Sequence, residues 1–147
     1  MRCYIFDIDG TLANGDHRLH HIKKEPKDWR AYFAECDKDE PIPHMIGLCL
    51  TLMERSNILF VSGRSDECRD ATLEWLRWHV SPDIRDDHLY MRKAGDHRND
   101  DILKIELLAE INARGHVPIM AFDDRNRVVK AWRDAGVPCM QCAPGDF

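Results

Sequence analysis

Two aspartates near the start of the chain stand two residues apart, in the segment Asp-Ile-Asp-Gly-Thr at residues 7–11. On an extended chain, side chains two residues apart point to the same side, so Asp7 and Asp9 are expected to lie close together. Paired carboxylates can bind a hard cation, and they can divide the roles of acid and base because like charges raise one of the two pKa values. Gly10 allows a sharp backbone turn beside them. A plain turn or helix cap is the alternative interpretation, since Asp, Gly and Thr are common turn residues.

Polar side chains follow two further apolar runs. The run Ile-Leu-Phe-Val leads to Ser62 and Gly63, and the run Ile-Met-Ala-Phe leads to Asp123 and Asp124. Short apolar runs of this kind predict buried strands, and open α/β sheets bind ligands at the carboxyl ends of their strands. Three strand ends with reactive side chains predict one site. As a lone feature, Asp124 could instead cap the helix that follows it.

The elements that must position these residues alternate along the chain. Apolar, β-prone runs predict strands at residues 3–6, 58–61 and 119–122, with weaker candidates at 88–91 and 138–142. Apolar residues at helical spacing predict helices over 42–53, 68–79, 103–111 and 128–132, and a short helix near 28–36. This alternation predicts a Rossmann-like α/β fold, with a parallel sheet of about five strands and helices on both faces. The length suits one domain over residues 1–147.

The segment Phe-Asp-Ile-Asp-Gly-Thr-Leu at residues 6–12 resembles the first motif of phosphatases of the haloacid dehalogenase (HAD) superfamily. Ser62 matches the second motif, a hydroxyl residue at the end of the next strand. Lys104 matches the third motif, a lysine near the start of a later helix, and Asp123–Asp124 matches the fourth, an acidic pair at a strand end. The motifs follow the family's order along the whole chain, so the resemblance implies the HAD fold.

The resemblance also implies a role for each residue. Asp7 stands where the family has its nucleophile, and Asp9 where it has its general acid/base. Dehalogenases of the superfamily lack an acid at the position of Asp9, which favours phosphate chemistry. The residues implied to bind the phosphate oxygens are Thr11, Ser62 and Lys104. The cofactor implied is Mg²⁺, bound by Asp7, Asp9 through its main-chain carbonyl, Asp123 and Asp124.

A closer resemblance is to the 3′-phosphatase domain of bacteriophage polynucleotide kinase-phosphatase. It is carried by Asp-Ile-Asp-Gly-Thr-Leu, Val-Ser-Gly-Arg, Arg-Asn-Asp-Asp-Ile-Leu-Lys, Asp-Asp-Arg, Val-Val-Lys-Ala-Trp-Arg and Pro-Gly-Asp-Phe, between residues 7 and 147. It implies four further substrate-binding residues, Arg18, Gly63, Arg64 and Asp100. Both arginines are expected at the mouth of the site, unless they are ordinary surface charges. Asp100 is expected to hold Lys104 against the phosphate, although a helix-stabilising pair four residues apart explains both residues equally well.

These resemblances imply a Mg²⁺-dependent phosphomonoesterase that works through an aspartyl-phosphate. The implied substrate is a nucleic-acid 3′-phosphate end, and a separate kinase or ligase would be a natural partner. Residues 14–43 and 81–99 also hold regular elements, so no full cap domain is expected, and an open site suits a large substrate. A small-molecule phosphatase such as a nucleotidase is the alternative. A receiver-type signalling module is disfavoured, because there the phosphoacceptor follows the third strand and the lysine comes last.

The composition is that of an ordinary globular protein, with 44% hydrophobic and 32% charged residues. The net charge of −5 argues against a broad nucleic-acid-coating surface. A few local cations suffice to bind a strand end, and the candidates are Lys23, Lys24, Arg92, Lys93 and Arg98. No apolar run is long enough to span a bilayer and no secretory signal opens the chain, so we expect a cytoplasmic protein without membrane contact.

Cysteine and tryptophan residues are expected to be structural. Of the six cysteines, only Cys139 and Cys142 have metal-ligand spacing, and no second pair accompanies them. Reduced thiols are therefore preferred over a structural zinc site. The tryptophans are expected to pack in or against the core rather than to stack on nucleic-acid bases. They are Trp29, Trp75, Trp78 and Trp132.

Overall fold

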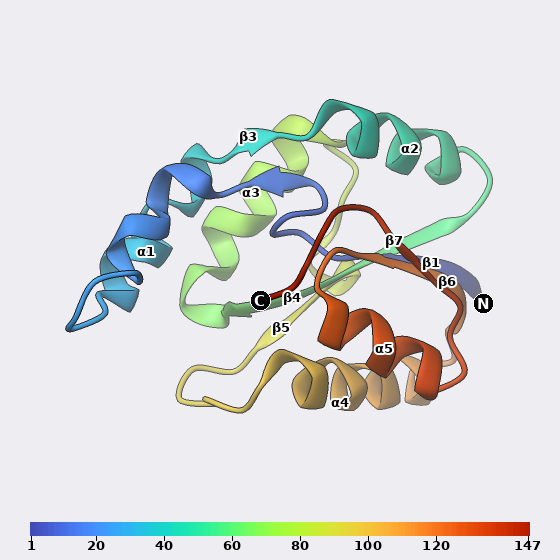
Figure 1. Ribbon diagram of the computed structural model, residues 1–147. Helices are drawn as coiled ribbons and strands as arrows, with labels where there is room; N and C mark the ends of the chain where they lie inside the picture. Colours follow the sequence, from blue (N-terminus) through green and yellow to red (C-terminus); the bar gives the residue numbers. More distant parts are fainter.

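A five-stranded parallel sheet forms the centre of the molecule, and the computed structural model describes residues 1–147. The strands lie in the order β5–β4–β1–β6–β7, so the first strand is the central one (Figure 1). Their bounds are Arg2–Phe6 (β1), Asn57–Ser65 (β4), Leu89–Arg92 (β5), Val117–Asp123 (β6) and Cys139–Gln141 (β7). All four pairings between neighbours are parallel.

Two helices cover each face of the sheet, with α2 and α3 on one side and α4 and α5 on the other (Figure 1). Their bounds are Pro43–Met53 (α2), Arg69–His79 (α3), Asp100–Ala113 (α4) and Asn126–Asp134 (α5). Neighbouring residues of β1 point to opposite faces, so Phe6 belongs to the core cluster that contains Trp75 of α3, and Ile5 belongs to the cluster that contains Trp132 of α5. Burial on both faces explains why the strands are apolar throughout. The predicted fold class is confirmed.

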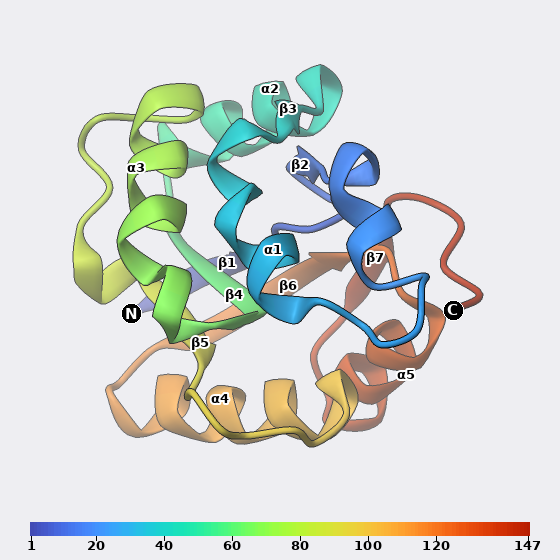
Figure 2. The same ribbon diagram turned by 90° about the vertical axis from the view of Figure 1, so that its left-hand side faces the viewer.

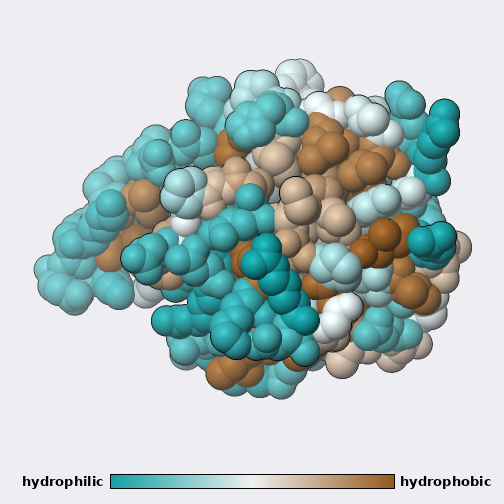
Figure 3. Space-filling model, turned by 45° about the vertical axis from the view of Figure 1, so that its right-hand side comes forward, coloured by the Kyte–Doolittle hydropathy of each residue, from teal (hydrophilic) through white to brown (hydrophobic).

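A small lobe projects beyond the carboxyl ends of the strands (Figures 1 and 2). It consists of β2 (Ala13–Asn14), the 3₁₀ helix η1 (Asp16–His21), α1 (Trp29–Ala34), the 3₁₀ helix η2 (Cys36–Lys38) and β3 (Glu40–Pro41). β2 and β3 pair antiparallel and join the lobe to the sheet. The surface of this projection is mostly hydrophilic (Figure 3). The lobe is far smaller than a cap domain, as expected from the length of the segment.

The structure corrects the sequence predictions in a few places. β4 does not end before Ser62 but continues to Ser65, with an irregularity in its pairing to β5 between these two serines. None of the four 3₁₀ helices is predicted from the sequence: η1 and η2 of the lobe, η3 (Asp66–Cys68) and η4 (Asp86–His88). Trp78 is 84% exposed and Trp29 is 48% exposed, so the expectation of core packing is wrong for Trp78 and holds only in part for Trp29. None of the helices combines the length and the apolar character needed to cross a lipid bilayer.

Candidate active site

Three carboxylates meet at the carboxyl end of the sheet. Asp7 follows β1, Asp123 is the last residue of β6, and Asp124 comes next. One ligand oxygen from each lies within 4.8 Å of the others, and all three residues are buried. The central position of β1 brings Asp7 beside Asp123, since the two strands are neighbours in the sheet. These residues form what we call the carboxylate group.

Lys104 reaches into the carboxylate group from the second turn of α4. Its Nζ atom donates to Asp7 Oδ1 at 2.7 Å and to Asp123 Oδ2 at 2.8 Å. Burial lowers the pKa of Lys104, but Asp123 and Asp7 outweigh that effect and raise it overall, so the ammonium stays charged. The indole of Trp132 also donates to Asp123 Oδ2, at 3.2 Å. Asp123 is therefore fixed from two helices.

The charges of this group do not balance without a cation. Three carboxylates face one ammonium, which leaves two negative charges in a buried place. Burial, followed by the charge of Asp123, raises the pKa of Asp7 well above its usual value, and the same two causes raise the pKa of Asp124 to about 6. A divalent cation would neutralise this excess negative charge, and donors that are all oxygen suit a hard cation such as Mg²⁺. The residues therefore fit the metal that the sequence implied.

The turn after β1 holds Thr11 and Gly10 against the same carboxylates. The hydroxyl of Thr11 donates to Asp7 Oδ2 at 3.1 Å. Gly10 has a φ of +81°, and a Cβ atom there would lie 2.1 Å from Asp124 Oδ2. Only glycine therefore permits both the backbone conformation and the close approach of Asp124.

The C-terminal tail closes one side of the site. Burial raises the pKa of the Cys142 thiol to about 11, so it keeps its proton. It lies 3.3 Å from the Thr11 oxygen, whose own hydrogen is directed at Asp7, so the thiol is the donor to Thr11. From the sequence, Cys142 is a reduced thiol or, together with Cys139, a ligand of a structural zinc. No pattern in the sequence marks this contact, because it joins residues 131 positions apart.

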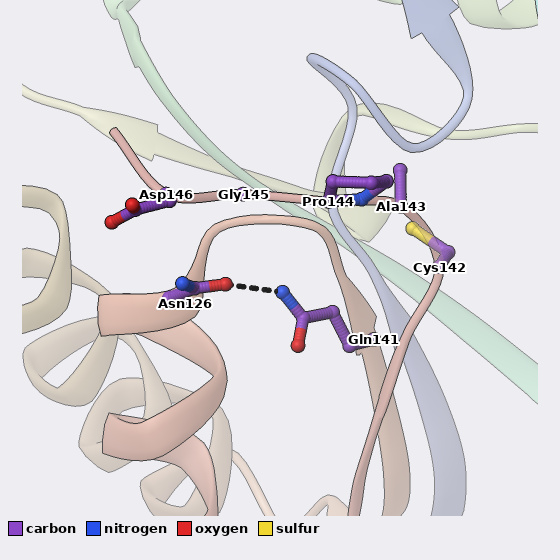
Figure 4. Close-up of a pocket in the computed structure, with 7 residues that line it drawn as sticks. All are labelled: Asn126, Gln141, Cys142, Ala143, Pro144, Gly145 and Asp146. Atoms are coloured by element: carbon purple, nitrogen blue, oxygen red, sulfur yellow. Dashed lines mark hydrogen bonds between the residues drawn. The ribbon is translucent and has the colours of Figure 1, made fainter.

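Beyond Cys142 the tail borders a shallow pocket beside α5 (Figure 4). The Gln141 amide donates to the side-chain oxygen of Asn126 at 2.6 Å and to the main-chain oxygen of Asp124 at 2.9 Å. Gly145 lies directly on the backbone of Asp124 and Arg125, where a Cβ atom would overlap it. These contacts fix the loop that carries Asp124. Asp124 does not cap α5, because the N-cap residue of that helix is Arg125.

Asp9 belongs to a second cluster beside the carboxylate group, formed with Arg18, Arg64 and Asp39. Arg64 binds Asp9 through Nη2 at 2.7 Å and through Nε at 3.0 Å, and Arg18 Nη2 binds it at 2.9 Å. Burial raises the pKa of Asp9, but Arg64 and then Arg18 outweigh it and lower it overall. The side chain of Asp9 remains 34% exposed, so it faces both the arginines and solvent.

Asp39 completes this arginine cluster, and sequence reasoning missed it. Its carboxylate accepts two hydrogen bonds from Arg18 at 2.8 Å, one from Arg64 at 2.9 Å, and lies 2.8 Å from His17 Nε2. Its side chain is fully buried. It lies in an irregular acidic stretch before β3, where nothing in the sequence separates it from solvent-exposed neighbours such as Asp37.

The expected position of both arginines is therefore wrong. They are neither surface charges nor open at the mouth of the site, since Arg18 is 0% and Arg64 2% exposed. Their donors are directed at Asp9, Asp39, the Tyr32 carbonyl and, from Arg64, the hydroxyl of Thr72. The arrangement points to an effect on Asp9 rather than to a direct grip on a strand phosphate.

Asp100 also differs from expectation. It makes no hydrogen bond to Lys104, but accepts from Arg92 at 2.5 Å and from Arg125 at 3.1 Å. It lies against Gly63, where a Cβ atom would come within 2.6 Å of its Oδ1. Asp100 thus holds Arg92 and Arg125 at the rim of the site and presents no donor to a phosphate. Gly63 makes room for this contact.

Ser62 is fully buried on β4, and its hydroxyl oxygen accepts a hydrogen bond from the main-chain N–H of Arg64 at 3.1 Å. The same bond shapes the end of the strand that delivers Arg64. The structure thus brings five predicted residues into direct contact, while Asp9 and the two arginines form the adjoining cluster. The five are Asp7, Thr11, Lys104, Asp123 and Asp124.

Comparison with known proteins gives concordant results. The family model of the HAD-type polynucleotide kinase PNKP phosphatase domain matches residues 1–147. A protein of Autographa californica nuclear polyhedrosis virus, named as a bifunctional polynucleotide kinase/RNA ligase, is 36% identical over 140 residues. These cover 93% of this chain but 18% of the viral protein, so the chain spans a small part of that relative.

Two solved structures share the fold. A chain from a Pnkp1/Rnl/Hen1 complex is 27% identical with a TM-score of 0.80, and the alignment covers 99% of this chain and 47% of that one. A class C acid phosphatase from Bacillus anthracis with tungstate bound has a TM-score of 0.69 at 18% identity, covering 99% of this chain and 67% of the phosphatase. Both likenesses extend over 99% of this chain and agree with its α/β fold.

Proposed function

The chain belongs to the family of the HAD-type polynucleotide kinase PNKP phosphatase domain, and on that premise we propose that it is a Mg²⁺-dependent phosphatase that removes a 3′-phosphate from a nucleic-acid end. The observation that carries the proposal is the buried carboxylate group around Lys104 at the carboxyl end of the sheet. The family model matches the chain over residues 1–147. The names of the matching family and of the viral relative refer to a polynucleotide kinase and an RNA ligase, and they support nucleic acid as the substrate.

Asp7, Asp123 and Asp124, together with the main-chain oxygen of Asp9, would hold Mg²⁺, which would supply positive charge against which the phosphate can be placed. Lys104 adds a further positive charge, and its hydrogen bonds orient both Asp7 and Asp123. Thr11 fixes the second oxygen of Asp7 from the opposite side. The nucleophile is thus held in one orientation before the substrate arrives, which is what phosphoryl transfer requires of the protein.

Asp7 attacks the phosphorus, and the bond between phosphorus and the 3′ oxygen breaks as an aspartyl-phosphate forms. Asp9 delivers a proton to the departing 3′ oxygen. Water then attacks the phosphorus of the aspartyl-phosphate while Asp9 takes a proton from it, and the bond to Asp7 breaks to release inorganic phosphate. The arginine cluster lowers the pKa of Asp9 in the free protein. The negative charge of a bound phosphate acts in the opposite direction and favours the protonated form.

The family relationship also supports partners with complementary chemistry. The viral relative is named for kinase and ligase activities, and this chain matches 18% of that protein. A 3′-phosphate blocks strand joining, so its removal prepares an end for a ligase. We therefore propose that a separate kinase or ligase acts on the same nucleic-acid ends as this chain.

A panel of phosphate esters tests the proposal. It compares 3′-phosphorylated oligonucleotides, the same oligonucleotides with a 5′-phosphate, nucleoside 3′- and 5′-monophosphates and a sugar phosphate, each with Mg²⁺ and with EDTA. We expect phosphate release from the 3′-phosphorylated oligonucleotides, and only with Mg²⁺. A preference for nucleoside 5′-monophosphates or sugar phosphates would reject the polynucleotide substrate and favour a small-molecule phosphatase. Equal release in excess EDTA would reject the role of the metal.

A further inference from the structure

The lobe beside the active site exposes an aromatic surface on α1. Trp29 stacks on Phe33 with ring centroids 5.9 Å apart and meets the edge of Tyr32 at 5.8 Å. Phe33 in turn packs against the main core, which fixes this group to the body of the protein. Trp29 is 48% exposed, so about half of its surface has no partner within the chain.

This aromatic surface is connected to Asp9 by two contacts. The guanidinium carbon of Arg18 lies 4.1 Å from the ring centroid of Tyr32, and the Tyr32 carbonyl accepts from Arg18 Nη1 at 3.3 Å. The Nη2 atom of the same guanidinium donates to Asp9 Oδ1 at 2.9 Å. Figure 2 shows α1 in front of the carboxyl ends of β1 and β4, and in Figure 1 it lies beyond the same ends. A group that enters the site thus passes close to α1.

Tyr32 can also donate a hydrogen bond at this place. Its phenol oxygen makes no hydrogen bond within the chain, although the residue is only partly exposed. Burial and the nearby charge of Asp9 raise the pKa of Tyr32 to about 12, so the phenol remains protonated at neutral pH. Arg18 lies over the ring, so Tyr32 offers a ligand its phenol donor rather than a stacking face.

Positive charge surrounds the same surface although the chain as a whole carries −5. Residues 23–30 contain four cationic side chains and two carboxylates, and all of them are exposed. The cationic residues are Lys23, Lys24, Lys27 and Arg30. Lys27 Nζ lies 5.9 Å from the centroid of Trp29. One of the two carboxylates, Asp28, is occupied as the N-cap of α1, where it accepts from Ala31 N. An aromatic face bordered by cations matches the chemistry of a single nucleic-acid strand.

We propose that Trp29 stacks on a base that precedes the phosphorylated 3′ end of a single strand, and that the Tyr32 phenol donates a hydrogen bond to the same strand, while the surrounding cations contact its backbone phosphates. This rests on the proposed function and extends it, because it states the path by which the strand leaves the site. Stacking tolerates any sequence, since every base has an aromatic face. The assignment reverses the expectation from the sequence that all tryptophans have packing roles.

Two exposed tryptophans provide a matched pair of variants. Trp29→Ala removes the proposed platform. Trp78→Ala removes a more exposed tryptophan from the last turn of α3, where Arg77 is accompanied by two carboxylates, Asp37 and Glu74, around the same pocket. We expect Trp29→Ala to raise KM for a 3′-phosphorylated oligonucleotide roughly tenfold relative to KM for a nucleoside 3′-monophosphate, as the loss of one stacked base implies. Trp78→Ala should leave both values at the wild-type level.

A binding measurement separates this inference from the proposed function. In EDTA, an unphosphorylated single-stranded oligonucleotide should quench tryptophan fluorescence of the wild type. Trp78→Phe should keep that quenching and Trp29→Phe should lose it. If the wild type binds in this way but releases no phosphate from 3′-phosphorylated ends, the proposed function fails and the platform stands.

The platform is overturned if the two alanine variants behave alike, or if no oligonucleotide quenches the wild type, which would leave this surface to a protein partner. It is also overturned if Trp29→Ala lowers the unfolding temperature and impairs both substrates equally, because that result assigns Trp29 to packing of the lobe.

Discussion

Replacement of Arg64 by lysine tests how the arginine cluster acts on Asp9. The guanidinium bonds Asp9 through Nε and Nη2, Asp39 through Nη2 and Thr72 through Nη1, so its donors point in several directions. Lysine keeps the charge but concentrates its donors at one atom. It can therefore hold Asp9 or Asp39 but cannot bond both carboxylates and Thr72 as the planar fork does.

The expected magnitude follows from the hydrogen bonds that are lost, because Arg18 still binds both Asp9 and Asp39 in the variant. The loss of one hydrogen bond to a charged group costs about 2 kcal/mol. For a domain of this size, that corresponds to a drop of roughly 6 °C in Tm. Loss of the orientation of a general acid/base reduces kcat by about a hundredfold, the lower end of what such a group contributes. Both effects should appear together because they arise from the same contacts.

The assay measures kcat of the Arg64→Lys variant on three substrates at saturating Mg²⁺. We expect similar losses in kcat for a 3′-phosphorylated oligonucleotide and a nucleoside 3′-monophosphate. The loss should be smaller for an activated aryl phosphate, whose leaving group needs little protonation. Arg98→Lys is the control, because Arg98 pairs with Asp96 and Glu106 on the surface. It should not change kcat.

A loss confined to the oligonucleotide would refute this reasoning. It would mean that Arg64 contacts the strand rather than Asp9. Equal losses on the aryl phosphate and on the unactivated esters would also contradict it, since they would separate Arg64 from the protonation step.

Three further predictions concern the carboxylate group. Asp7→Asn should reduce kcat more than about a thousandfold, as removal of a nucleophile does. Its Tm should change little, because the substitution also removes repulsion from Asp123. Turnover near the wild-type rate would contradict the role of Asp7. Mg²⁺ at a hundred times its Kd should stabilise the fold by about 2.7 kcal/mol over an EDTA sample, and an unchanged Tm would contradict the metal site. Gly10→Ala should destroy activity, because its Cβ would meet Asp124 Oδ2 at 2.1 Å. Gly115→Ala is its control, since φ is +88° in open space there, and only the backbone cost of about 1–2 kcal/mol should appear.

The sheet and the carboxylate group could be predicted because their signals are local. Each strand is a short apolar run, and parallel strands bring their carboxyl ends to one edge. Asp7 and Asp123 each directly follow or end such a run, so their meeting follows from topology alone. Lys104 was expected there from the resemblance to the third motif of the family, not from a local pattern.

The arginine cluster could not be predicted, because it depends on burial that no local pattern specifies. Arg18 and Arg64 are charged residues of the kind that usually lie at a surface. They are buried because Asp39 from the lobe neutralises them, and Asp39 has no periodic or motif context. Asp100 was paired with Lys104 on helical spacing, but Lys104 turns inward to Asp7 while Asp100 turns to Arg92 and Arg125. Spacing along one helix cannot distinguish these partners.

The central position of β1 has a consequence for biosynthesis. The strand is made first, yet one of its two neighbours is β6, which begins at Val117. Asp7 and Lys104 stand 97 residues apart, so the nascent chain has no assembled nucleophile until most of it has left the ribosome. During that interval β1 exposes an apolar, unpaired edge of the kind that aggregates or recruits chaperones. Long-range pairing of this kind also slows folding, so yield at expression should respond to temperature and to chaperone supply more than to point changes at the surface.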